Sequence, residues 1–137
     1  MNGFLGSATS HILVVEDDCD LHAVLKVALE YDGYYATFTQ MKAAAIALLS
    51  AVKVDLVIAD VGLADGLGTE VVKHATTVGV PSIVMTGNPN HMRDLELKAA
   101  SYLPKPFNME RFRQEVRDNL RRGEQPPQTA RGLSLPR

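Results

Sequence analysis

HILVVEDD, residues 11–18, places a short apolar run directly before three carboxylates. A short β-branched run that is bounded by charge is typical of a buried strand. LVIAD, residues 56–60, repeats the pattern, because its apolar run again ends in a carboxylate, Asp60. SIVMTG, residues 82–87, is a third run of this kind and carries Thr86 at its end. The three stretches predict three buried strands, each ending in a polar side chain.

Segments with helical spacing separate these strands. Apolar residues at one-face helical spacing follow the first strand, at Leu21, Val24, Leu25, Ala28 and Leu29. Further helices are predicted over 43–49, from the loop at 66–68 to about 76, weakly over 91–99, and at the end, with Met109, Phe112, Val116 and Leu120 on one face. Two more short strands are predicted over 34–38 and 101–103. This alternation predicts an α/β fold in which helices cover both faces of a parallel sheet.

Length and composition are those of one compact domain. The chain has 137 residues, of which 46% are apolar and 22% charged, and its formal net charge is −2. We expect residues 1–10 to form a flexible arm, 11–122 the folded domain and 123–137 a disordered tail rich in proline and glycine. The small net charge gives no reason to expect binding to nucleic acid or to a membrane.

The sequence also argues against several kinds of site and compartment. The single cysteine, Cys19, excludes an internal disulfide framework and a multi-cysteine zinc site. The four histidines show no metal-ligand spacing; they are His11, His22, His74 and His91. No secretory signal is present, and no apolar run reaches the roughly 18 residues that a membrane span needs. We therefore expect a cytoplasmic protein.

The polar residues that follow the predicted strands should meet at one edge of the sheet. In doubly wound sheets the functional crevice lies outside the carboxyl ends of the strands. These ends carry Glu16, Asp17, Asp60, Thr86 and, just past the last strand, Lys105. Clustered carboxylates repel one another unless they are neutralised, and Mg²⁺ favours carboxylate and phosphate oxygens. An aspartate beside a metal, a lysine and a hydroxyl can form an aspartyl phosphate.

Four motifs in this order resemble the receiver domains of two-component response regulators, the CheY-like family. They are ILVVEDD at 12–18, LVIAD at 56–60, VMTG at 84–87 and YLPKPF at 102–107. The resemblance covers about residues 11–121, which is nearly the whole predicted domain. It implies a flavodoxin-like (βα)5 fold, a doubly wound parallel five-stranded sheet with the strand order 2-1-3-4-5.

The resemblance also implies a phosphoacceptor and a metal site. Asp60 occupies the phosphoacceptor position, and Asp17 occupies that of the main metal carboxylate, with Glu16 beside it. Asp60 itself and the backbone carbonyl of Gly62 would complete the ligands of Mg²⁺, or of Mn²⁺ in its place. Asp18 falls one step beyond the usual acidic pair, so we expect it to cap the following helix or face solvent instead of binding the metal.

Three further residues match family positions that handle the phosphoryl group and the signal. Thr86 would hydrogen-bond the phosphoryl group, and Lys105 would pair with its charge. Tyr102 is the aromatic position that, together with Thr86, forms the conformational switch of the family. The Lys105–Pro106 peptide bond is expected to be cis, which the resemblance implies and the composition does not.

The sequence departs from the family pattern in two places. After the phosphoacceptor the family usually reads Asp-x-x-Met/Leu-Pro-x-x-x-Gly, whereas this chain reads DVGLADGLG over 60–68, with Ala64 in place of proline. We expect this change to loosen the loop. The stretch between Thr86 and Lys105 is shorter than usual in the family. A Gly-Ala pair usually precedes the aromatic residue, whereas here Tyr102 is preceded by Ala99, Ala100 and Ser101. The fourth helix should therefore be short or irregular.

The implied function is that of a single-domain response regulator. The phosphoryl donor would be a histidine kinase or a histidine phosphotransfer protein, and the output a change of conformation read by a downstream protein. The chain would not be an enzyme beyond assisting its own phosphorylation and dephosphorylation. We expect no direct nucleic-acid contact, because residues 123–137 are too few for a helix-turn-helix domain. A homodimer is neither favoured nor excluded.

The motifs argue against two other interpretations and leave a third as an alternative. A phosphatase of the haloacid-dehalogenase type would carry a second aspartate two residues after its nucleophile, where this chain has Gly62, and its nucleophile would follow the first strand. A nucleotide-binding domain would have a glycine-rich loop after the first strand, where this chain has carboxylates. An unphosphorylated receiver-like binding module is the strongest alternative, although it would usually have lost one of the acidic residues or Lys105.

Overall fold

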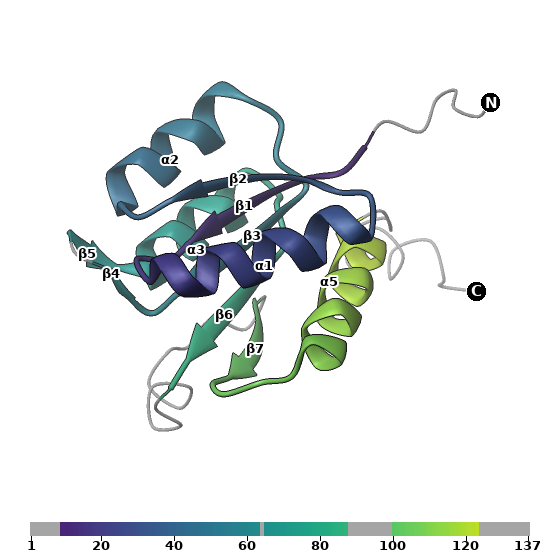
Figure 1. The fold of residues 1–137 in the computed structure, drawn as a ribbon. Coiled ribbons are helices and arrows are strands. Elements are labelled where there is room, and N and C mark those ends of the chain that lie inside the picture. The colour runs from purple at the N-terminus through teal and green to yellow at the C-terminus, as the bar shows by residue number, and fades with distance from the viewer. Residues whose placement is uncertain (1–8, 64, 88–99, 124–137) are drawn as a thin grey trace, which may run out of the picture.

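The computed structural model describes residues 9–63, 65–87 and 100–123. Their main feature is a parallel five-stranded sheet with the order β2-β1-β3-β6-β7 (Figure 1). The strands are β1 (His11–Val15), β2 (Tyr35–Thr39), β3 (Leu56–Asp60), β6 (Ser82–Thr86) and β7 (Ala100–Pro104). Because β4 and β5 lie outside this sheet, β6 and β7 are its fourth and fifth strands in chain order. The sheet therefore has the order 2-1-3-4-5 that the family resemblance implies, and that prediction is confirmed.

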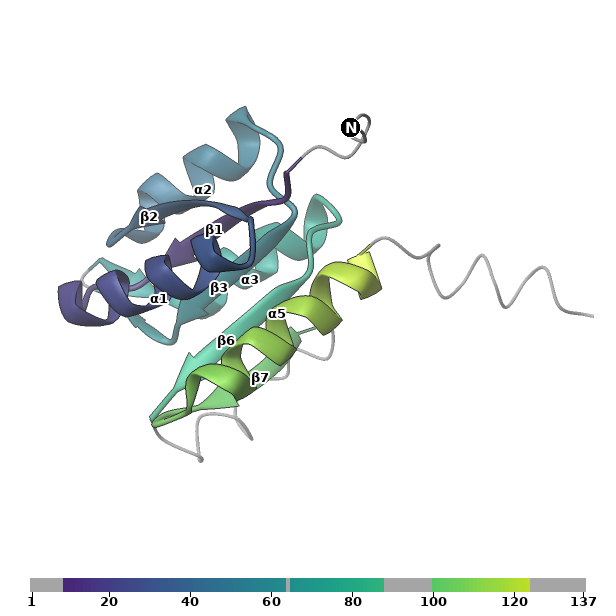
Figure 2. The same cartoon turned by 45° about the vertical axis from the view of Figure 1, so that its right-hand side comes forward.

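Helices cover both faces of the sheet, as the alternation of elements predicts. They are α1 (Cys19–Tyr31), α2 (Lys42–Ala51), α3 (Gly68–Thr77) and α5 (Met109–Gly123). Helices α1 and α5 lie together on one face, and α2 and α3 on the other (Figure 2). The helix predicted over 91–99 lies outside the described residues, as does the tail beyond 123. In the part of the chain that is described, no helix is long and apolar enough to cross a membrane.

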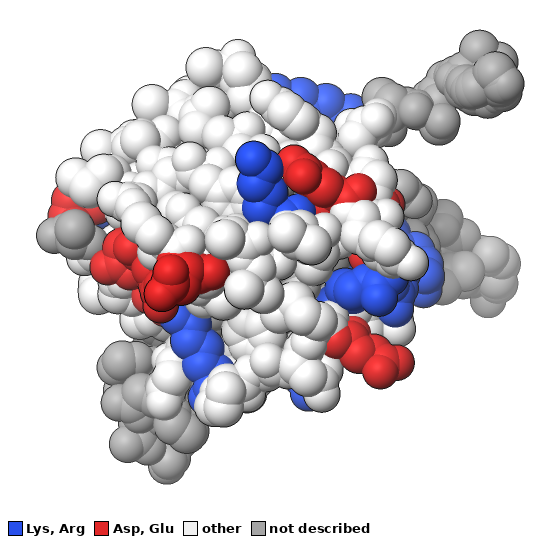
Figure 3. All heavy atoms as spheres, viewed as in Figure 1, with Lys and Arg blue, Asp and Glu red and all other residues white. Residues whose placement is uncertain are grey.

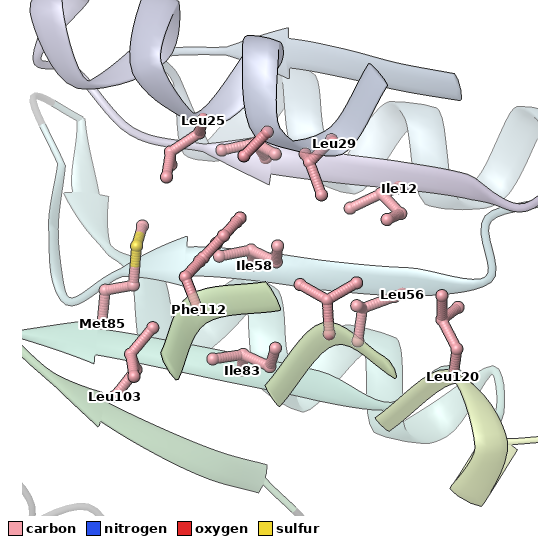
Figure 4. Packing of buried hydrophobic residues seen from close by; sticks show 13 residues of the cluster. Ile12, Leu25, Leu29, Leu56, Ile58, Ile83, Met85, Leu103, Phe112 and Leu120 are labelled. Atoms are coloured by element: carbon pink, nitrogen blue, oxygen red, sulfur yellow. The ribbon is translucent and has the colours of Figure 1, made fainter. Parts of the chain in front are cut away.

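Two hydrophobic clusters fill the spaces between the sheet and its helical layers. Side chains alternate along a strand, so Ile12 of β1 enters one cluster and Leu13 the other. The cluster beneath α1 and α5 contains the predicted apolar face of the last helix (Figure 4), with Phe112, Val116 and Leu120 buried and Met109 packed against them. Strands β1, β3 and β6 are therefore buried on both faces, which explains why their sequences are nearly continuous apolar runs.

The segment after Asp60 differs from its prediction. Instead of a plain loop it contains a short antiparallel hairpin of β4 (Gly62–Leu63) and β5 (Gly66–Leu67). Gly68 then begins α3, and its backbone N–H donates to the carbonyl oxygen of Val61 at 2.7 Å. A Cβ at Gly68 would overlap the carbonyl oxygen of Asp60, so only glycine fits there. Ala64, which we expected to loosen this segment, lies outside the described residues.

A polar network joins β7 to α5 and accounts for the unusual serine at position 101. Ser101 Oγ donates to Asn119 Oδ1 at 3.0 Å, and Arg122 Nη1 donates to the same oxygen at 3.0 Å. Asn119 Nδ2 donates to the carbonyl oxygen of Glu115 at 2.8 Å. Asn119 is fully buried. A hydroxyl at position 101 therefore gives the buried amide a partner from the neighbouring strand.

Replacing Asn119 by alanine should lower the free energy of unfolding by about 2 kcal/mol, because it removes a satisfied buried amide and leaves a space. Ser101→Ala should cost only about 1 kcal/mol, since Arg122 still donates to the amide oxygen. Urea unfolding measures both changes, with the exposed Gln114→Ala on the same helix as the control. A loss for Asn119→Ala no larger than that of the control would show that the network contributes nothing.

Candidate functional site

The carboxyl ends of β1 and β3 bring three carboxylates together. One oxygen from each of Glu16, Asp17 and Asp60 can be chosen so that all three lie within 4.8 Å of one another. Figure 3 shows acidic side chains gathered over the N-terminal end of α1, next to a basic side chain. Glu16 is only 1% exposed, whereas Asp17 is exposed and the side chain of Asp60 is 17% exposed. The cluster is therefore open to solvent on one side and anchored in the interior on the other.

Lys105 lies against this cluster, just past the end of β7. Its Nζ is 3.0 Å from Glu16 Oε1 and 3.3 Å from Asp60 Oδ1. Its backbone N–H donates to the carbonyl oxygen of Thr86 at 2.7 Å, which continues the pairing of β6 with β7. The Lys105–Pro106 bond is cis, as predicted. Lys105, which follows the edge strand β7, thus contacts the carboxylates at the ends of β1 and β3.

Burial and charge shift the pKa values of this group in identifiable directions. Burial raises the pKa of Glu16, and the negative charge of Asp60 adds to that effect, although the hydrogen bond from Lys105 opposes it. Burial alone would lower the pKa of Lys105, but its hydrogen bonds and its attraction to Glu16 and Asp60 outweigh burial, so its pKa is raised. Lys105 is therefore held in its charged form, and it partly compensates three clustered carboxylates.

Asp18 caps α1, which confirms the first of the two roles expected for it. Its Oδ1 accepts hydrogen bonds from the backbone N–H groups of Asp20 at 2.9 Å and Leu21 at 3.3 Å. The backbone N–H of Asp18 donates to Glu16 Oε2 at 3.1 Å. The cap thus fixes the start of the helix and, through the same residue, one oxygen of the buried glutamate.

His22 is a neighbour of the site that the sequence did not reveal. Its Nε2 contacts the carbonyl oxygen of Glu16, and its ring centroid lies 5.0 Å from that of Phe38. Of the other histidines that are described, His11 contacts Lys53 O and Thr37 Oγ1, and His74 contacts Ser50 Oγ. These are structural contacts, in agreement with the absence of metal-ligand spacing.

Thr86 and Tyr102 lie on neighbouring strands of the sheet. In the register of β6 and β7, Thr86 faces Pro104 and Val84 faces Tyr102. Thr86 is 2% exposed, and Tyr102 is half-buried against the cluster beneath α2 and α3. Gly62 lies in β4, two residues past Asp60. The switch roles of Thr86 and Tyr102, and a metal contact by the Gly62 carbonyl, remain predictions.

The site suits a small divalent cation that prefers oxygen ligands. Its donors are carboxylate oxygens only, and among the described residues no histidine or cysteine joins the cluster. With Lys105 as the cation in contact, three carboxylates leave the group net negative. This donor set fits Mg²⁺ or Mn²⁺ and does not favour the softer metals. A cation held by these carboxylates would offset their negative charge and so lower the repulsion of an incoming anion.

Comparison with known families agrees with this geometry. The model of the response regulator receiver domain matches residues 12–117. The uncharacterised transcriptional regulatory protein YkoG of Bacillus subtilis is 32% identical over 116 residues, which cover 81% of this chain and 51% of that protein. The transcriptional regulatory protein CpxR of Klebsiella pneumoniae is 35% identical over 115 residues, which cover 81% and 49%. The chain thus spans about half the length of these curated relatives.

Solved structures with the same fold include two at 26% identity. The CheY-like receiver domain protein from Methanospirillum hungatei superposes with a TM-score of 0.77 over 85% of this chain and 98% of its own. TrrA from Thermotoga maritima, solved in complex with Mg²⁺ and BeF, superposes with a TM-score of 0.74 over 80% and 98%.

Proposed function

Because the chain belongs to the receiver-domain family of response regulators, we propose that it accepts, in the cytoplasm, a phosphoryl group on Asp60 from a histidine kinase or a histidine phosphotransfer protein. One observation carries the proposal. Asp60 ends the central strand β3, and its partly exposed carboxylate lies 3.3 Å from the ammonium of Lys105, within an acidic cluster. The position joins a nucleophile, an opposing positive charge and access from solvent.

We propose that Mg²⁺ or Mn²⁺ is held by the carboxylates of Asp17, Glu16 and Asp60 and by the backbone carbonyl of Gly62. When bound, the metal would neutralise the carboxylates and the phosphate oxygens that approach them. Glu16 is the least exposed of the three carboxylates, and its contacts with Lys105 and the Asp18 backbone hold it in place. Asp17 is exposed at the opening and is therefore free to approach the cation directly.

The transfer itself needs little more than positioning and charge. A carboxylate oxygen of Asp60 forms a bond to phosphorus while the bond from phosphorus to the donor's imidazole nitrogen breaks, and the imidazole takes up a proton. Lys105 is charged and would attract the phosphoryl oxygens, and the Thr86 hydroxyl would donate a hydrogen bond to one of them. The chain assists only its own phosphorylation and the later hydrolysis of the acyl phosphate.

The output that we propose is a contact with a downstream protein. The phosphoryl group adds about 1.5 to 2 negative charges and draws the Thr86 hydroxyl towards it, and Tyr102 then shifts further into the interior. The contact would be made by residues 11–122 themselves, whereas the curated relatives, which are about twice as long as this chain, are transcriptional regulatory proteins.

Incubation with acetyl phosphate and Mg²⁺ should add a single phosphoryl group to the protein. Intact-mass spectrometry measures the gain, and hydroxylamine should remove it, because an acyl phosphate is labile to this nucleophile whereas a phosphate ester is not. Omitting the metal, or adding EDTA, should prevent the gain. An unchanged mass under all conditions, with the protein folded, would favour the unphosphorylated binding module instead.

A further inference from the structure

The loop that follows Asp60 is fastened to α2 by a contact that the proposed reaction does not explain. Helix α2 begins at Lys42, and its N-cap residue Met41 has no side chain that can accept a hydrogen bond. The first N–H groups of a helix have no partner inside it and need an acceptor. Here the acceptor is Asp65, which lies 23 residues further along the chain. Its Oδ1 accepts from the backbone N–H of Lys42 at 2.6 Å, and its Oδ2 accepts from that of Ala43 at 3.0 Å.

The side chain of Lys42 strengthens the same junction. Its Nζ donates to Glu70 Oε1 at 2.9 Å, in the first turn of α3. It also lies over Gly66, because a Cβ built there would be only 2.9 Å from Nζ. Helix α2 therefore contacts the segment that follows Asp60 at three residues. They are Asp65 and Gly66 of the hairpin and Glu70 of α3. The hydrogen bonds from Lys42 and Ala43 lower the pKa of Asp65, so its carboxylate is charged at neutral pH.

The hairpin connects this junction to the phosphoacceptor. Asp65 lies between β4 and β5, whose register pairs Gly62 with Leu67. The turn is thus only a few residues from the Gly62 carbonyl. At the base of the hairpin, the backbone N–H of Gly68 donates to the carbonyl oxygen of Val61 at 2.7 Å, and a side chain at Gly68 would overlap the carbonyl oxygen of Asp60. A shift at position 65 would therefore reach the backbone that carries Asp60 and Gly62.

We propose that Asp65 is a positioning residue that, by capping α2 from the hairpin, holds the Gly62 carbonyl where the metal site needs it. The inference rests on the proposed function for the identity of the site. It gives a physical role to a loop that lacks the proline usual in the family: the carboxylate of Asp65 anchors the backbone from outside. The sequence signal for such an anchor is the absence of a capping side chain at Met41.

The first test is the Mg²⁺ affinity of Asp65→Ala, measured by calorimetric titration. We expect binding to weaken by about tenfold, the effect typical of losing a residue that supports a metal ligand. At saturating Mg²⁺ the rate of phosphorylation by acetyl phosphate should return to within about twofold of the parent's rate, because Asp60 and Lys105 are unchanged. Affinity equal to the parent's would overturn the proposal.

A second variant separates positioning from simple stability. Met41→Asp, combined with Asp65→Ala, gives α2 a local N-cap but leaves the hairpin unattached. The thermal midpoint should recover while the Mg²⁺ affinity stays weak. If both recover together, Asp65 only stabilises the helix, and the proposal is wrong. Should Asp65→Ala not fold, Asp65→Asn replaces it throughout; its single carbonyl oxygen should weaken binding by a few-fold, and parent-like binding would count against the proposal.

Asp55→Ala is the matched control. Asp55 Oδ2 also accepts a backbone N–H from a distant segment, that of His11 at 2.8 Å, but at the opposite end of the strands. This variant should bind Mg²⁺ as the parent does, and weakening equal to that of Asp65→Ala would show that the effect is not local. If the parent binds Mg²⁺ but gains no phosphoryl group, the proposed function fails while the affinity ratios still decide the role of Asp65.

Discussion

Asp60→Asn should abolish phosphorylation completely, so that acetyl phosphate and Mg²⁺ leave the intact mass unchanged. An amide cannot form an acyl phosphate, and the neighbouring carboxylates are poor substitutes for Asp60. Glu16 is buried and bound to Lys105, and Asp17 has no lysine ammonium in contact among the described residues. The expected loss is therefore total and not a reduction in rate.

The Asp60→Asn experiment needs a control for folding and for general loss of charge. Asp55→Asn makes the same chemical change at the amino end of the sheet and should be phosphorylated like the parent. Peptide mapping after borohydride reduction would locate the acyl phosphate in the parent at residue 60. A phosphoryl group on the Asp60→Asn protein, labile to hydroxylamine, would show that another carboxylate is the acceptor.

Asp17→Ala should remove measurable Mg²⁺ binding, with the dissociation constant raised by at least about a hundredfold, since even residues that only support a ligand are worth about 10- to 100-fold. Asp17 is the most exposed carboxylate of the cluster, so it is the one that we expect to bind the cation directly. Calorimetric titration measures the change directly.

Phosphorylation of Asp17→Ala should fail for the same reason. Two unit charges about 4 Å apart repel by roughly 4 kcal/mol at an effective dielectric constant of 20, and the incoming phosphate is a dianion. Without a metal, Lys105 is the one positive side chain among the described residues that lies against the remaining carboxylates and would meet that dianion. Asp20→Ala, in the first turn of α1, is the matched control, because it removes a nearby acidic side chain that is not in the cluster. Unchanged Mg²⁺ affinity in Asp17→Ala would contradict the ligand assignment.

The strands and the site could be predicted because both depend on short-range patterns. Strands β1, β3 and β6 are buried on both faces, so the sequence of each is an almost continuous apolar run. A carboxylate or a threonine marks the end of each run in the sequence. Parallel pairing then brings those ends to one edge without any further information. The strand order and the roles of individual residues came from the family resemblance, since periodicity alone contains neither.

The features that were missed are a local hairpin without a sequence signal and several contacts between residues that are distant in the sequence. The β4–β5 hairpin lies in a glycine-rich stretch with no hydrophobic periodicity, so nothing local distinguishes it from a loop. The cap of α2 by Asp65 spans 23 residues. The serine at position 101 is explained by its hydrogen bond to Asn119 of α5, which is 18 residues away in the sequence. Lys105 was expected to meet phosphoryl charge, but its shortest ion pair is to Glu16, 89 positions away.

Gly68 limits how this sequence can diverge. The space that a side chain would need is occupied by the backbone carbonyl of Asp60, so every substitution at Gly68 would displace either that backbone or the start of α3. The ninth residue of the DVGLADGLG stretch therefore has no alternative to glycine, whatever side chains stand at the positions before it. The glycine that closes the family pattern is thus retained for space, not for reactivity. A variant without the Asp60 carboxylate would need the same glycine, because the backbone carbonyl at position 60 would remain in place.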